Sequence, residues 1–212
     1  MSRWIAAALA IIGFALAASY WIASVATAKP APKAGSVVKI INGPGHGSGV
    51  HIGNGYILTA AHVTKGSESV EVLSDDGKTT KAEILWSSSA YDVTLLRADI
   101  KAKASPLSCR EPYEGEAIRA SGNPYDQKFV SASGHVAGAA REYSPWKRVF
   151  VVDTTMVHGM SGGPTFDAGG NVIGINVGVM VVSVGMASYV ASFGYVVPSS
   201  SICGLMGRAV PA

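Results

Sequence analysis

Charged residues are scarce in this chain: they make up 15% of its 212 residues, whereas 48% are hydrophobic. So apolar a composition excludes wholesale intrinsic disorder, which requires low hydrophobicity and high charge. Dense basic runs are also missing, and the 17 Lys and Arg residues nearly balance the 14 Asp and Glu residues. Nucleic acid is therefore not an expected partner.

Cysteine is scarcer still, with Cys109 and Cys203 far apart in the sequence. Neither has the close Cys or His neighbours that a zinc site needs, and no other cluster with metal-ligand spacing is present, so neither a metal nor a cofactor is expected. In an oxidising compartment the two thiols could form one disulfide across about 95 residues, which would stabilise the fold by about 4 to 5 kcal/mol. Two separate buried thiols are the alternative.

The N-terminus carries an apolar run, Trp4 to Ala28, that follows Arg3 and contains no charge. With the A-x-A pattern Ala26-Thr27-Ala28 it describes a secretory signal peptide. About 20 apolar residues also suffice to cross a bilayer, so an uncleaved signal anchor is the alternative, and a buried core helix is a third interpretation. The first two both place the body outside the cytoplasm, because the preceding positive charge tends to stay inside. Residues 29–35 contain two prolines and should form an extended linker.

The body, residues 36–212, consists of short β-branched runs separated by turn residues, without a long helical period until the C-terminus. This pattern predicts an all-β domain of two six-stranded antiparallel barrels, at about residues 36–100 and 115–198, joined by a proline-containing linker. The residues after Pro198 should form a short helix. The run Gly178 to Gly185 fits either a mobile lid or a long β-hairpin, and we favour the hairpin. The expected strands are residues 36–41, 47–52, 56–59, 69–73, 79–86, 93–97, 116–120, 128–140, 147–153, 164–166, 172–179 and 191–197.

The most specific motif is Gly159-Met160-Ser161-Gly162-Gly163-Pro164, which lies between two expected strands. A nucleophilic serine needs an exposed Oγ and nearby backbone N–H groups that face a developing oxyanion, and glycine permits the turn that this requires. Ser161 is therefore the candidate nucleophile, and the N–H groups of Gly159 and Ser161 are the candidate oxyanion donors. A plain glycine-rich loop would also explain this composition.

Two further residues have the context of partners for this serine. His62 follows small residues at a strand end, and an imidazole can accept the serine proton and return it to a leaving amine. Asp92 directly precedes an apolar strand, where a carboxylate could fix the histidine tautomer. Asp99 follows that strand and is flanked by basic residues, which indicates a solvated position. Of the other histidines, His158 lies three residues before Ser161 and could line the substrate cleft.

These three residues occur in the order His, Asp, Ser, with gaps of 30 and 69 residues, which is the order of the chymotrypsin template. On these motifs the body resembles the trypsin-like serine peptidases, and most of all the protease domain of the HtrA (Deg) family. The matching segments are residues 47–50, 56–63, 92–93, 122–124, 159–164 and 172–176.

The resemblance implies a cleft between two barrels in which peptide bonds of protein or peptide substrates are hydrolysed through an acyl-enzyme. By position in the motif, Thr155 should lie near the base of the S1 pocket. Asn176, Val177 and Gly178 should belong to a wall that pairs with the substrate backbone. No acidic residue is evident there. An uncharged, small or medium-sized apolar P1 side chain is therefore expected.

The chain also departs from the family pattern. Met160 stands where Asn or Asp usually precedes the nucleophile, which could alter the cleft wall but leaves the backbone donors available. No PDZ domain follows Ala212, and no Ile-Val-Gly-Gly start is present for activation by a new N-terminus. A catalytically impaired, protease-fold binding or scaffold protein is the alternative function. An esterase is disfavoured because α/β-hydrolases have the order Ser, acid, His. The oligomeric state stays open.

Overall fold

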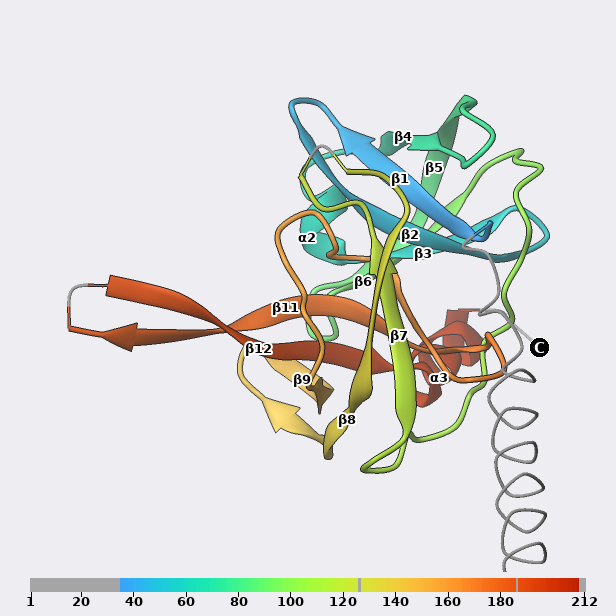
Figure 1. Cartoon of the computed structure of the whole chain (residues 1–212). Coiled ribbons are helices and arrows are strands. Elements are labelled where there is room, and N and C mark those ends of the chain that lie inside the picture. The colour runs from blue at the N-terminus through green and yellow to red at the C-terminus, as the bar shows by residue number, and fades with distance from the viewer. Residues whose placement is uncertain (1–34, 126, 186, 210–212) are drawn as a thin grey trace, which may run out of the picture. The chain divides into compact units, whose positions relative to one another are not determined.

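Figure 1 shows the protein as a computed structural model, which describes residues 35–125, 127–185 and 187–209. The expected leader or anchor, and its linker up to Ala34, lie outside the described residues. The described part contains the helices α2 (Ala61–Thr64) and α3 (Ser199–Ala209), and neither is long and apolar enough to cross a membrane. All other described elements are strands, so the all-β expectation is confirmed.

Six strands from the first half of the described chain close into an antiparallel barrel in the order β1-β2-β3-β6-β5-β4. They are β1 (Val37–Asn42), β2 (Gly45–Gly53), β3 (Tyr56–Thr59), β4 (Ser69–Leu73), β5 (Thr79–Ser88) and β6 (Val93–Arg97). The turn between β4 and β5 contains Gly77 at a φ of 83°, a conformation that glycine adopts without steric cost. Because side chains alternate along a strand, one set fills the barrel interior with residues such as Ile40, Ile57 and Leu96.

The second half forms another closed barrel, in the order β10-β11-β12-β9-β8-β7. Its strands are β7 (Ala117–Gly122), β8 (Val130–Tyr143), β9 (Trp146–Val152), β10 (Pro164–Phe166), β11 (Val172–Val184) and β12 (Ala187–Pro198). Strand β9 shows the alternation clearly, because Phe150 and Val152 belong to the cluster inside this barrel. Val149 and Val151 instead pack in a cluster that also contains Val50 of the first barrel, so this second cluster joins the two barrels.

Two features tie the segment between the barrels to the second barrel. Cys109 and Cys203 form a disulfide that links this segment to α3. Next to it, Arg110 forms ion pairs with Glu116 and Asp167, and the two carboxylates raise the pKa of its guanidinium above the ordinary value. Burial alone would raise the pKa of Asp167, but hydrogen bonds from Asn171, Arg110 and Gly169 together lower it. Asp167 therefore stays ionised and closes the turn between β10 and β11.

The structure differs from the sequence-based expectation mainly in the lengths of a few elements. Strands β11 and β12 continue past the expected 172–179 and 191–197 and pair as far as Val184 and Ala187, so the long hairpin expected at Gly178 to Gly185 is confirmed. It projects from the second barrel in Figure 1. The short helix α2 was not expected. It begins two residues after the end of β3 and contains His62. Both differences concern the candidate site.

Candidate active site

His62 and Asp92 are joined by two hydrogen bonds. The ring Nδ1 of His62 lies 2.7 Å from Oδ2 of Asp92, and the backbone N–H of His62 donates to Oδ1 over 2.8 Å. Asp92 takes the left-handed region, with φ 55°, which Asp tolerates better than most residues. Its side chain is 13% exposed, whereas that of His62 is 46% exposed. The carboxylate therefore fixes both the position of α2 and the orientation of the ring, while the far edge of the imidazole remains accessible.

Trp146, at the start of β9, is a third member of this group that the sequence did not reveal. Its indole Nε1–H donates to Oδ2 of Asp92 over 3.4 Å. The indole also packs against Gly178, where an added Cβ would lie 2.6 Å from Cη2, and tilts against the ring of Tyr195 at 5.2 Å. Burial and Tyr143 raise the pKa of Tyr195 to about 12, so its hydroxyl is neutral at physiological pH. No motif marked Trp146, because its contact with Asp92 depends on how the barrels dock.

Ser161 lies in the loop before β10, and backbone hydrogen bonds hold this loop against β2 of the first barrel and β11 of the second. The Ser161 carbonyl accepts from the N–H of Ser48 over 2.8 Å, and Gly162 N–H donates to the Asn176 carbonyl over 2.7 Å. Gly162 has a φ of 83°, and a Cβ there would lie 2.7 Å from the nitrogen of Ala60. The loop thus packs on the chain two residues before His62. Among the described residues, Ser161 Oγ makes no hydrogen bond.

Two backbone N–H groups of this loop are turned away from its internal hydrogen bonds. The His158 carbonyl accepts from Tyr125 N–H over 3.3 Å, and the Met160 carbonyl accepts from Gly163 N–H over 3.0 Å. In a trans peptide the N–H points opposite to the carbonyl, so the N–H groups of Gly159 and Ser161 face the other side. Within the described part of the chain neither has an acceptor.

Ser48, in β2, fixes the loop from the first barrel. Its Oγ donates to the Gly159 carbonyl over 2.7 Å and accepts from the backbone N–H of Asn123 over 2.8 Å. The Asn123 side chain in turn donates to the Val38 carbonyl over 2.9 Å. Both Ser48 and Asn123 lie in segments that carried the family resemblance, but the residue pattern gave no sign of this network.

The other predicted site residues are distributed around the loop. Thr155 is exposed and does not line the pocket beside His62. His158 is exposed too, with its ring 6.3 Å from that of His46 and 6.2 Å from that of Tyr125. Asn176 is 1% exposed. Its side-chain oxygen accepts a hydrogen bond from Thr165 Oγ1, and its side-chain N–H donates to the Ser121 carbonyl. Its side chain therefore supports the wall from inside and cannot face a substrate.

Met160 does not alter the cleft wall as the sequence allowed. It is 3% exposed, and its side chain belongs to the core cluster of the second barrel, where Gly122 leaves room for it. An apolar residue at this position is therefore explained by burial, and the backbone donors beside it are unaffected.

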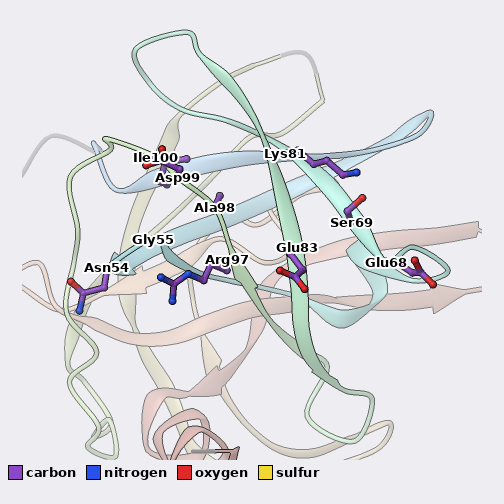
Figure 2. Close-up of a pocket in the computed structure, with 10 residues that line it drawn as sticks. All are labelled: Asn54, Gly55, Glu68, Ser69, Lys81, Glu83, Arg97, Ala98, Asp99 and Ile100. Atoms are coloured by element: carbon purple, nitrogen blue, oxygen red, sulfur yellow. The ribbon is translucent and has the colours of Figure 1, made fainter.

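A pocket of about 560 Å³ opens beside His62 and Asp92, and Pro145, Trp146 and Val177 are among the residues that line it. Another hollow, of about 780 Å³, lies on the first barrel and is shown in Figure 2. Its lining combines acidic and basic side chains, and none of the candidate catalytic residues is among them. The chemistry of the candidate site thus belongs with the pocket beside His62.

Comparison with known proteins decides the family. The model of the trypsin-like peptidase domain matches residues 47–175, which is more than half of the chain. The chain belongs to this family. It is 30% identical over 139 residues to a protein of Rhizobium meliloti named probable periplasmic serine endoprotease DegP-like, and the match covers 63% of this chain and 28% of that protein. It is 31% identical over 177 residues to the chloroplastic Protease Do-like 1 of Arabidopsis thaliana, covering 78% and 39%.

A solved structure gives the same result. The serine endoprotease from Yersinia pestis superimposes with a TM-score of 0.71 and 26% identity, covering 84% of this chain and 63% of that one. The resemblance to HtrA protease domains is therefore confirmed. This peptidase domain spans well under half the length of the two curated relatives named above.

Proposed function

We propose that this chain is a serine endopeptidase that hydrolyses peptide bonds through an acyl-enzyme. Ser161 is the nucleophile, His62 the general base and acid, and Asp92 the residue that orients His62. The N–H groups of Gly159 and Ser161 stabilise the oxyanion. The observation that carries the proposal is the pair of hydrogen bonds that His62 donates to the Asp92 carboxylate. They lie beside a loop that presents two backbone N–H groups without an acceptor in the described part of the chain.

The geometry supports a defined sequence of proton transfers. Because Nδ1 of His62 donates to Asp92, Nε2 carries no proton in the neutral ring and can accept the one from Ser161 Oγ. As Oγ bonds to the substrate carbonyl carbon, the carbonyl oxygen becomes negative and is bound by the two N–H groups. The imidazolium then gives its proton to the amine as the peptide bond breaks. A water molecule repeats both steps on the acyl-enzyme and releases Ser161.

We further propose that the protein acts outside the cytoplasm. The disulfide between Cys109 and Cys203 supports this location, because structural disulfides persist in oxidising compartments. Relatives named as periplasmic serine endoproteases support it as well. Substrates are proteins or peptides in this proposal.

One observation favours a second candidate function, a protease-fold binding protein with an impaired active site. Ser161 Oγ makes no hydrogen bond to His62 in the described structure. Catalytic hydrogen bonds are often long or misaligned without substrate and tighten only in the complex, so an active enzyme is compatible with the same geometry. Reactivity of Ser161 distinguishes the two candidates.

The test is covalent labelling of the full chain with a fluorophosphonate probe, with casein cleavage measured in parallel. We expect the wild type to react, and Ser161→Ala and His62→Ala to lose both labelling and cleavage. His135→Ala is the matched control, because the side chain of that histidine is 59% exposed and forms an ion pair with Asp153, away from the candidate catalytic residues. A folded wild type that is not labelled would make the binding protein the better account.

Trp146→Phe is expected to lower kcat about fivefold and to leave KM nearly unchanged. Phenylalanine keeps the apolar contact with Gly178 but removes the N–H that reaches Oδ2 of Asp92. That bond is long, and Asp92 retains its two bonds from His62, so we assign it about 1 kcal/mol. Trp146 is thus a positioning residue that acts through Asp92. Steady-state kinetics on a casein-derived peptide, together with the pH profile of kcat, measure the effect.

Trp86→Phe is the control for this variant. The indole N–H of Trp86 is buried and has no partner among the described residues, so its removal should leave kcat unchanged. If Trp146→Phe matched the wild type in kcat and in pH profile, Trp146 would have no role in orienting Asp92.

A further inference from the structure

The hairpin of β11 and β12 has an apolar surface without charge. Between Asp167 and Arg208 the sequence contains no acidic, basic or histidine residue. Half of the exposed large hydrophobic side chains of the described structure lie on this hairpin: Val181, Val182, Tyr189, Val190 and Phe193, which are 41% to 60% exposed. Soluble proteins usually protect exposed strands with charges or proline, so this hairpin is suited to bind a partner.

One edge of β11 continues directly from the nucleophile loop. Strand β10 occupies this edge as far as Ile175, and the backbone of Asn176 then bonds to Gly162 and Gly163, next to Ser161. From Val177 to Val184 no described residue pairs with this edge, because β12 pairs with the other one. Figure 1 shows this part of β11 reaching away from the barrel. Its free backbone groups therefore start beside Ser161 and extend to the hairpin tip.

The same edge reaches the candidate catalytic residues. Val177 lines the pocket that also contains His62 and Asp92. Seven residue steps of about 3.3 Å each give an edge of about 23 Å from Val177 to Val184. A strand of seven or eight residues would occupy about this length.

We propose that the projecting part of β11, residues 180–184, binds an extended, apolar segment of an unfolded polypeptide substrate as an additional strand. This inference rests on the proposed function and extends it, because it assigns substrate binding to the hairpin beyond the wall at residues 176–179. Antiparallel addition is favoured, since antiparallel pairs are the more stable. Such a strand runs from the hairpin tip toward Ser161, so the residues N-terminal to the scissile bond lie on the hairpin. The substrate class is therefore long, unfolded and free of charge in that segment.

The unpaired edge distinguishes this occupant from a lipid surface. Lipid tails could cover Val182 and Val190 but could not bond to the backbone N–H and C=O groups of β11, and leaving such groups unpaired in an apolar medium is costly. A second copy of the chain could pair with the edge, but it would then block the way to Ser161. A substrate strand satisfies the edge and also reaches the nucleophile.

The test uses the full chain and peptides built around the casein bond that the wild type cleaves fastest. One series lengthens the peptide on the N-terminal side of that bond from about three to about eight residues, and a second lengthens the C-terminal side. We expect kcat/KM to rise at least about tenfold in the first series and to stay flat in the second. N-methylation of alternate peptide bonds in the longest peptide should remove the gain, because it removes backbone donors.

Two hairpin variants should lose this gain while keeping wild-type rates of short-peptide cleavage and fluorophosphonate labelling. The first combines Val182→Lys with Val190→Lys. The second replaces residues 181–190 with the dipeptide Asn-Gly, which joins Met180 to Ala191 by a short turn and so removes the tip. The control combines Leu85→Lys with Val130→Lys, whose side chains are 42% and 36% exposed on other strands. The control should retain the gain.

Three results would overturn the proposal: no gain with N-terminal extension, a gain that survives removal of the tip, or a gain insensitive to N-methylation. If the hairpin variants kept the gain but lost binding to phosphatidylglycerol vesicles, the hairpin would be assigned to lipid. If they kept the gain but changed in oligomeric mass, it would be assigned to a second copy of the chain. Failure of the proposed function is seen separately, as absence of labelling in the wild type. Fluorescence anisotropy of labelled peptides with Ser161→Ala would then still measure binding to β11.

Discussion

Asp92→Asn is expected to lower kcat for a casein-derived peptide about 10⁴-fold at neutral pH, with a much smaller change in KM. In the wild type the carboxylate accepts from both Nδ1 and the backbone N–H of His62. An asparagine amide placed to donate to Nδ1 would leave the proton on Nε2, and the ring could then not accept the proton of Ser161. In the chymotrypsin template the same change of acid to amide lowers kcat by about this factor while the geometry is kept.

Asp99→Asn is the matched control. Asp92 precedes β6 and Asp99 follows it, and Asp99 is exposed and lines the separate hollow on the first barrel. It should keep wild-type kcat. Circular dichroism and thermal unfolding of both variants establish that neither loses its fold. If Asp92→Asn retained more than a tenth of the wild-type kcat, Asp92 would not set the tautomer of His62.

The elements that the sequence predicted are those whose signal is local. Strand alternation and the glycines around Ser161 each reflect a requirement of the backbone at that position. Such requirements can be read from neighbouring residues. Most strand bounds therefore lie within a few residues of those expected.

What the sequence could not predict depends on contacts between distant segments. The bond from Trp146 to Asp92 spans 54 residues, and that from Ser48 to Gly159 spans 111. The direction of Met160 into the core and the internal use of the Asn176 amide follow from how the second barrel packs. A long hairpin at Gly178 to Gly185 was expected, but the bounds expected for β11 and β12 were too short, because alternating apolar and small residues do not show where a strand leaves the barrel.

Gly159→Ala is expected to lower kcat by about 10² to 10³, the usual cost of losing one oxyanion donor. Gly159 has a φ of 94°, and a Cβ there would lie 2.5 Å from the Asn123 carbonyl oxygen and 2.9 Å from His46 Nε2. Backbone carbonyls cannot yield cheaply, so the peptide between residues 158 and 159 must turn, and its N–H leaves the oxyanion position. KM should change little, because the oxyanion forms only as the carbonyl is attacked.

Gly77→Ala separates this effect from backbone strain alone. Gly77 has a similar φ of 83°, but an added Cβ there meets nothing within 4 Å. Gly77→Ala should lose about 1 to 2 kcal/mol of stability and Gly159→Ala at least as much, and only Gly159→Ala should lose kcat. A peptide aldehyde gives the sharper measurement, because its adduct with Ser161 carries the oxyanion: its inhibition constant should rise in Gly159→Ala in step with the fall in kcat/KM. An unchanged inhibition constant together with a lowered kcat would place the defect outside the oxyanion site and remove Gly159 from the donors.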